Sequence, residues 1–229
     1  MTKFLYLDLE TIPVQDVNAI LRIAETVKPP GTMKKAETIA AWEATDKPKA
    51  VEEAILKTSF NGAYGHVCCI GWAVDNEPVQ SVIWPFDVDN EAAALYTFKS
   101  IVEKVNFPPT IVGHNVAEFD IRFLWQRAFV LGIRMPSWFP RDPKPWSREV
   151  FDTMTTFAGS RNTISMDTLC AALGIAGKDG DMDGSKVADA WANGEYERIA
   201  AYCRDDVERT RQIHKRMMIA LGEVAYVYR

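Results

Sequence analysis

Short apolar runs alternate with longer amphipathic stretches along most of the chain. The apolar runs have the length of buried strands, and the amphipathic stretches repeat their apolar residues every three or four positions, as helices do. Strands are predicted at residues 3–9, 67–74, 79–86 and 109–116, and residues 150–157 are a strand or a strand-to-helix turn. Helices are predicted at residues 15–27, 90–105, 117–133, 165–174 and 195–221. This order is typical of an α/β protein in which helices flank a mixed β-sheet.

Residues 28–65 differ in character from the rest of the chain. They are rich in Lys, begin with Lys-Pro-Pro-Gly and contain helical stretches around residues 34–44 and 48–58. A chain of 229 residues is most naturally one domain. We therefore expect residues 1–229 to form a single domain, in which residues 28–65 are a mobile inserted segment that lies over the surface of the core.

The composition narrows the class of protein. No window approaches the roughly 18 apolar residues of a membrane span, and the N-terminal residues lack the pattern of a secretory signal. The four cysteines include no C-x-x-C pair, so we expect buried free thiols in a reducing, cytoplasmic setting. A net charge of −5 argues against a general nucleic-acid coating protein. It does not argue against an enzyme that meets phosphates through bound metal ions.

The first predicted strand carries two acids. The run "FLYLDLETI" at residues 4–12 places Asp8 and Glu10 two positions apart, and such residues point to the same face of a strand. Adjacent carboxylates in a half-buried setting repel each other and resist desolvation. A divalent cation held by oxygen ligands would relieve both effects. A strand end whose acids reach solvent explains this short pattern equally well.

Two further acids occupy unusual positions. Asp120 begins a predicted apolar helix directly after a buried strand. Taken alone, it is explained by the helix dipole, which stabilises an acid in the first turn. Asp206 lies on the apolar stripe of the last predicted helix, so it faces the core, where an unpaired acid is costly. Tyr202 precedes it by four residues on the same face. Asp205 points away from the stripe and can pair with Arg209 at i+4.

The ordered set of motifs resembles a known family. The matching stretches are "DLET" (8–11), "GHNVAEFD" (113–120), "SMDTLCAALGI" (165–175), "DGSKVADAW" (183–191) and "YCRDDVERT" (202–210). They resemble the DEDD superfamily of 3′–5′ exonucleases, tyrosine subtype, which has a ribonuclease-H-like fold. The chain is most similar to the stand-alone group related to the proofreading domain of family-B DNA polymerases.

The resemblance implies a set of catalytic residues. Asp8, Glu10, Asp120 and Asp206 would bind two divalent cations, expected to be Mg²⁺ with Mn²⁺ as a substitute, because both ions favour oxygen ligands. Asp8 would bridge the two ions. Tyr202 would orient the attacking water, since a phenol with a pKa near 10 is a poor general base at neutral pH.

The resemblance also implies a substrate and its contacts. The main chain at Thr11 and Ile12 would receive the 3′ end, Phe119 would contact the substrate, and Asn115 would contact a sugar or phosphate or else cap a turn. The loop at residues 138–148 is a candidate base-stacking surface through Trp138, Phe139 or Trp146, or a proline-stiffened loop whose aromatic side chains pack on the core.

The expected function is a 3′–5′ exonuclease that releases 5′-mononucleotides from single-stranded DNA. It would act in DNA replication or repair, with a polymerase or replication protein as a partner in trans. Two alternatives remain open. One is the same chemistry on RNA ends, because nothing in the sequence indicates how a 2′-hydroxyl is treated. The other is a non-catalytic nucleic-acid-binding accessory module of a polymerase.

Overall fold

A five-stranded mixed sheet forms the centre of the protein. The computed structural model describes residues 4–84, 91–105, 108–144, 147–178 and 180–223. The strands are β1 (Phe4–Ile12), β2 (His66–Val74), β3 (Gln80–Ile83), β4 (Thr110–Gly113) and β5 (Val150–Asp152), in the order β3-β2-β1-β4-β5. Central β1 is antiparallel to β2 and parallel to β4. The predicted α/β fold with a mixed sheet is therefore confirmed.

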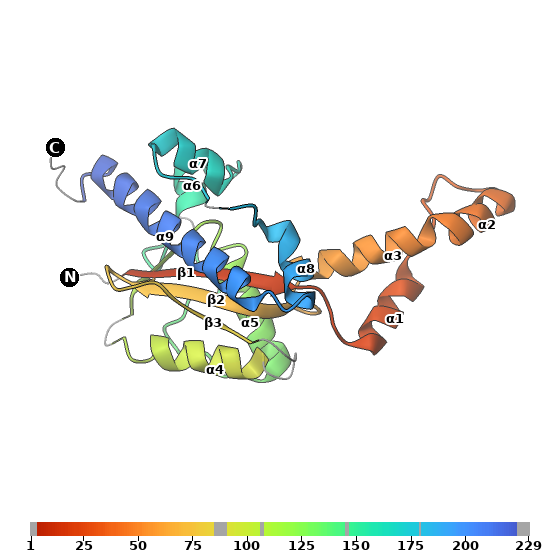
Figure 1. The fold of residues 1–229 in the computed structure, drawn as a ribbon, viewed down its shortest axis with the longest axis horizontal. Coiled ribbons are helices and arrows are strands. Elements are labelled where there is room, and N and C mark those ends of the chain that lie inside the picture. Colours follow the sequence, from red (N-terminus) through yellow and green to blue (C-terminus); the bar gives the residue numbers. More distant parts are fainter. Residues whose placement is uncertain (1–3, 85–90, 106–107, 145–146, 179, 224–229) are drawn as a thin grey trace.

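Helices cover both faces of this sheet (Figure 1). One face carries α4 (Glu91–Val102) and α5 (Asp120–Leu131). The other carries the long helix α9 (Tyr196–Ala220) together with α6 (Thr153–Ala158), α7 (Met166–Leu173) and α8 (Val187–Ala192). Among the described residues, none of these helices is long and apolar enough to span a membrane.

The alternation of side chains along β1 divides the core between the two faces. Leu5, Leu7 and Leu9 are buried with residues of α4 and α5. Tyr6 packs instead with Val207 of α9. Asp8 and Glu10 share the parity of Tyr6, so the strand places both acids on the face that α9 covers.

A close approach between β2 and α9 sets the depth of this face. Gly71 pairs with Asp8 across the two strands. A Cβ atom at Gly71 would lie 2.8 Å from Sγ of Cys203 and 3.0 Å from Cγ2 of Val207. The helix can therefore rest directly on the sheet backbone beside Asp8, because residue 71 has no side chain.

The sequence predicted the remaining elements unevenly. Residues 150–157 are the strand-to-helix turn, because β5 runs directly into α6. The predicted helix 117–133 begins only at Asp120 and the predicted strand 109–116 ends at Gly113, so the residues between them form a loop. The short helix α8 was not predicted.

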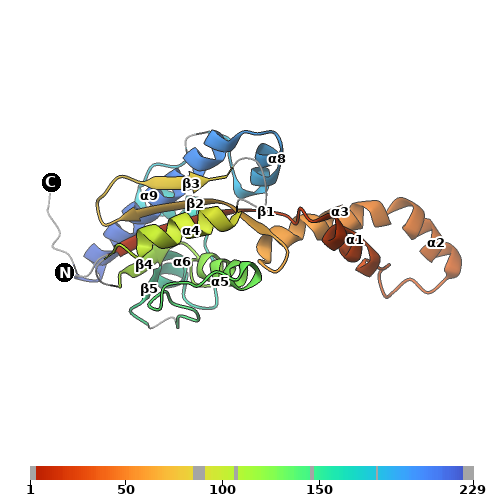
Figure 2. The same ribbon diagram turned by 90° about the horizontal axis from the view of Figure 1, so that it is seen from below.

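Residues 14–60 form an arm that extends beyond one end of the sheet (Figures 1 and 2). It contains α1 (Val17–Thr26), α2 (Ala36–Thr45), α3 (Lys47–Leu56) and the 3₁₀ turn η1 (Lys57–Phe60). Both α1 and α2 pack on α3. The expectation that residues 28–65 lie over the core surface is wrong, because Ala19 of α1 and Trp42 of α2 are the only buried side chains of the three helices. Their contacts are mainly with one another, through α3.

We expect Gly71→Ala to destabilise the protein. The added methyl group meets the short, buried side chains of Cys203 and Val207 and then the carbonyl oxygen of Cys203 at 3.2 Å, so the free energy of unfolding should fall by about 1–3 kcal/mol, as for other overpacked cores. Gly31→Ala is the matched control, because a Cβ atom there has no atom within 4 Å. Urea unfolding measures both variants. Equal stability of Gly71→Ala and the wild type would contradict the close packing described here.

Candidate active site

The two acids of β1 lie side by side at the end of the strand where its regular pairing stops. Glu10 is buried and Asp8 is partly buried. The register between β1 and β2 shifts between Glu10 and Thr11, which bends the strand immediately after the acids. Asp8 is thus fixed by regular sheet pairing, and Glu10 stands at the last position before the irregularity.

Asp120 reaches the same place from the neighbouring parallel strand. The chain leaves β4 beside β1, makes a short loop and begins α5 at Asp120, which is buried. Burial raises the pKa of Asp120 well above its usual range, and the N–H groups of Asp120 and Leu9 partly offset this rise by donating to its carboxylate. The bond from Leu9 connects Asp120 to the part of β1 between Asp8 and Glu10.

Helix α9 supplies Asp206 and Tyr202, which lie one turn apart over the sheet. Burial raises the pKa of Asp8 most, followed by the charges of Glu10, Asp206 and Asp120. Burial also raises the pKa of Glu10, with Asp206 as the next cause. The charges of Asp206 and Asp120 thus act on both Asp8 and Glu10, so the four predicted carboxylates lie near one another.

Asp8, Glu10 and Cys203 form a group of potential metal-binding residues in the described part of the chain, and this group does not include Asp120 or Asp206. Their ligand atoms lie within 4.8 Å of one another. Burial raises the pKa of the Cys203 thiol well above its usual range, and its Sγ lies 3.6 Å from the carbonyl oxygen of Asp8. A neutral thiol in the core is a poor ligand for a hard cation, so Cys203 is best explained as packing.

Unsatisfied oxygen atoms distinguish the candidate ligands from a nearby structural acid. Within the described part of the chain, Oδ2 of Asp8 and Oδ1 of Asp120 are buried without a hydrogen-bond partner. Asp152 is also buried, but its two oxygens accept bonds from the N–H groups of residues 115, 117, 154 and 155. Bare buried carboxylate oxygens are costly. A divalent cation that prefers oxygen ligands, such as Mg²⁺ or Mn²⁺, fits this donor set.

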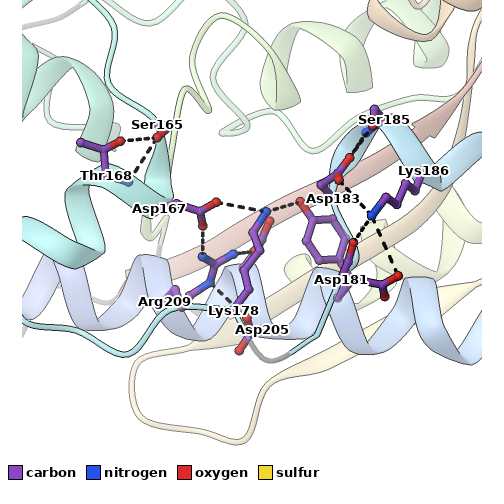
Figure 3. A network of polar contacts seen from close by, with 12 residues as sticks. Ser165, Asp167, Thr168, Lys178, Asp181, Asp183, Ser185, Lys186, Asp205 and Arg209 are labelled. Carbon is purple, nitrogen blue, oxygen red and sulfur yellow. Dashed lines mark hydrogen bonds and ion pairs between the residues drawn. The ribbon is translucent and has the colours of Figure 1, made fainter.

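Asp152 and Lys178 also shape the candidate site, and the sequence did not predict either of them. Asp152 holds the loop before Asp120 by accepting hydrogen bonds from its N–H groups. The sequence could have indicated it, because it is an acid at the end of a short apolar strand. Lys178 donates a hydrogen bond of 3.2 Å to the hydroxyl of Tyr202. No spacing rule pointed to Lys178, because it comes from a loop. It also lies 3.7 Å from Asp167 (Figure 3).

Tyr202 remains a neutral phenol in this setting. Burial raises its pKa, and the charges of Asp206, Glu10 and Asp8 raise it further. Its hydroxyl also donates to Asp206. A phenol in these surroundings can orient a water molecule but cannot remove its proton at neutral pH.

Arg209 balances part of the negative charge. Its guanidinium contacts Asp167 at 2.7 Å and Asp205 at 3.1 Å (Figure 3). The predicted pairing of Asp205 with Arg209 is therefore confirmed. Arg209 also binds the carboxylate of Asp206, a contact that helical spacing did not single out. One face of Asp206 is thus held by a permanent cation and the other by Tyr202.

The predicted substrate residues lie around this cluster in different ways. Thr11 uses its hydroxyl to bond the carbonyl of Ser59 at 2.7 Å, and the side chain of Ile12 is buried, so only its main chain could contact a substrate. Asn115 has a φ of 63°, which favours its alternative role as a turn residue. Phe119 is partly buried and directly precedes Asp120.

The loop after α5 mostly packs on the core. Phe139 is buried, with its ring 6.2 Å from that of Phe98, and Trp138 packs against the same cluster. Trp146 lies outside the described residues. Phe139 therefore packs on the core and is not a base-stacking surface, and Trp138 is partly buried in the same way.

Replacing Asp8 with Asn should stabilise the protein in EDTA at pH 7. Folding raises the pKa of Asp8, so the folded protein keeps a proton that the unfolded chain releases, and wild-type stability declines as the pH rises above about 4. The amide does not ionise. We expect a gain of roughly 1–3 kcal/mol in the free energy of unfolding, shrinking toward pH 4, measured by urea unfolding. A variant no more stable than the wild type at pH 7 would contradict the raised pKa.

Comparison with solved structures supports the fold. The chain resembles the family B DNA polymerase from the hyperthermophilic archaeon Pyrobaculum calidifontis, with a TM-score of 0.59 and 16% sequence identity. The likeness covers 96% of this chain, which spans about 25% of the length of that polymerase. At this identity the likeness shows the fold, and the sheet and its flanking helices have the predicted ribonuclease-H-like arrangement. A comparison with curated proteins finds no match.

A family model covers most of the sequence. Its description is "Predicted 3'-5' exonuclease related to the exonuclease domain of PolB", and it matches residues 60–227. Asp120, Tyr202 and Asp206 lie within the matched residues, whereas Asp8 and Glu10 precede them. Because the matched residues make up well over half of the sequence, the chain belongs to the family of predicted 3′–5′ exonucleases related to the exonuclease domain of PolB.

Proposed function

We propose that the protein is a metal-dependent 3′–5′ exonuclease that hydrolyses single-stranded DNA to 5′-mononucleotides. The observation that carries the proposal is the convergence of four carboxylates from β1, α5 and α9, among which Asp8 and Asp120 have buried oxygens without partners. A purely structural acid cluster would satisfy these oxygens with backbone N–H groups, as Asp152 does.

The proposed metal ligands are Asp8, Glu10, Asp120 and Asp206. Two divalent cations bound there would activate a water molecule, neutralise the phosphate oxygens and stabilise the departing 3′ oxygen. Asp8 is central to the set, because the charges of Glu10, Asp206 and Asp120 all act on it. This supports its role as the bridging ligand.

The remaining residues of the site would position the water and the phosphate. Tyr202 keeps its proton, so it would act as a hydrogen-bonding group that orients the attacking water. Lys178 fixes the hydroxyl of Tyr202. Arg209 holds one side of the Asp206 carboxylate in place.

DNA is the preferred substrate class because the family description refers to the exonuclease domain of a DNA polymerase. Hydrolysis of RNA ends is the second candidate, since the same metal-dependent chemistry acts on a phosphodiester whether or not a 2′-hydroxyl is present. Action beside a polymerase in trans is part of the same proposal. The intact set of acids and Tyr202 disfavours a non-catalytic accessory module.

Incubation with 5′-labelled single-stranded oligonucleotides tests the activity. We expect a ladder that shortens from the 3′ end with Mg²⁺ or Mn²⁺ and disappears in EDTA, with DNA cut faster than RNA. Asp8→Ala and Asp206→Ala should each lose at least about 100-fold in rate, since even outer-shell metal partners cost 10- to 100-fold. Tyr202→Phe should lose about 100-fold through misplaced water.

Glu103→Gln is the control, because this half-exposed acid pairs with Lys99 on α4, on the opposite face of the sheet. Its rate should equal that of the wild type. Internal cuts, activity that persists in EDTA, or full activity of Asp8→Ala would overturn the proposed function.

A further inference from the structure

The turn η1 joins the arm to the strand that carries Asp8 and Glu10. The hydroxyl of Thr11 donates to the carbonyl of Ser59 at 2.7 Å. The N–H of Val14 donates to the hydroxyl of Thr58 at 2.8 Å, and Thr58 is buried. These bonds fix the base of the arm directly after the two acids of β1.

The other side of the same turn is fixed to α5, the helix that begins with Asp120. The guanidinium of Arg127 donates to the carbonyl of Gly62 at 2.9 Å, and the amide oxygen of Gln126 accepts from the N–H of Gly62 at 2.9 Å. Arg127 is itself held by a buried ion pair of 2.6 Å with Glu91. The segment 58–62 is therefore anchored between the two elements that supply Asp8, Glu10 and Asp120.

Phe60 projects from this anchored segment. Its side chain is 74% exposed, the highest value among the large hydrophobic residues described. Its ring centroid lies 6.4 Å from that of Phe119, which lies 5.7 Å from that of buried Phe123. The three rings lead from buried Phe123 through Phe119, the residue directly before Asp120, to exposed Phe60.

Exposure alone would carry no weight, because single exposed aromatic residues are common. Phe129 is 66% exposed and Phe157 is 51% exposed. Phe60 differs in its place. Its neighbour Ser59 is bonded to Thr11 and its own ring contacts Phe119, so it stands between two of the predicted substrate contacts.

We propose that Phe60 is a base-stacking platform for the unpaired nucleotides next to the 3′-terminal one. The inference rests on the proposed function and specifies its substrate: a strand whose bases are free to leave their own stack. Stacking on an aromatic ring tolerates any base, because every base has a π-face. The rigid attachment of the turn means that little conformational freedom is lost when a base stacks on it.

Steady-state kinetics on single-stranded DNA test the platform. Phe60→Leu keeps an apolar side chain but removes the aromatic face, so KM should rise about 5- to 150-fold, the range expected for one stacked base. The effect should fall on KM much more than on kcat. Phe60→Trp should keep KM within about threefold of the wild type. Phe129→Leu, the same change at a similarly exposed phenylalanine on the helix that begins with Asp120, should match the wild type.

Photochemical cross-linking gives a readout that does not depend on hydrolysis. An oligonucleotide with 5-iodouracil at one of the four 3′-terminal positions is irradiated with the protein in EDTA, and the linked residue is identified by mass spectrometry. We expect linkage to Phe60 from a position inside the 3′ end, lost in Phe60→Leu.

The outcomes separate the two proposals. Metal-dependent shortening with an unchanged KM for Phe60→Leu and no linkage at residue 60 overturns the platform and leaves the exonuclease standing. A wild-type protein that shortens no strand overturns the proposed function and the platform together.

Discussion

Electrostatic repulsion among buried carboxylates is the constraint on which the rest of the site depends. Asp8, Glu10 and Asp120 all have raised pKa values, because burial and the neighbouring acids oppose their ionisation. A chain that only had to be stable would separate such groups. Here the sheet, the start of α5 and the close approach of α9 at Gly71 hold them together. The fold thus maintains an arrangement that favours the binding of cations.

The surrounding residues compensate this charge only in part. Arg209 binds Asp206, and Lys178 reaches the hydroxyl of Tyr202, but both cations approach from the side of α9 and the loop after α7. On the β1 side, oxygens of Asp8 and Asp120 lack partners within the described residues. This asymmetry orients the cluster, with fixed protein cations on one side and unsatisfied oxygens on the other. Membership of an exonuclease family related to PolB agrees with such a site.

The sequence predicted the parts of the site that follow from local periodicity. The two-residue period of β1 placed Asp8 and Glu10 on one face, and the helical stripe of α9 placed Tyr202 and Asp206 toward the core. It could not predict Lys178, which reaches the site from an irregular loop. Nor could it predict that backbone N–H groups donate hydrogen bonds to both carboxylate oxygens of Asp152. The direction of the arm was also beyond it. Whether helices pack on the sheet or on one another depends on three-dimensional apolar contact, and residues 28–65 carry little of it.

The most direct test of the central claim is anomalous X-ray diffraction from crystals grown with Mn²⁺. The account predicts strong anomalous peaks between the carboxylates of Asp8, Glu10, Asp120 and Asp206, with oxygen distances near those of hard-cation ligands. These peaks should weaken or vanish in crystals of Asp8→Ala. Carboxylates that stay together with no manganese between them, or manganese bound only elsewhere on the surface, would contradict the account.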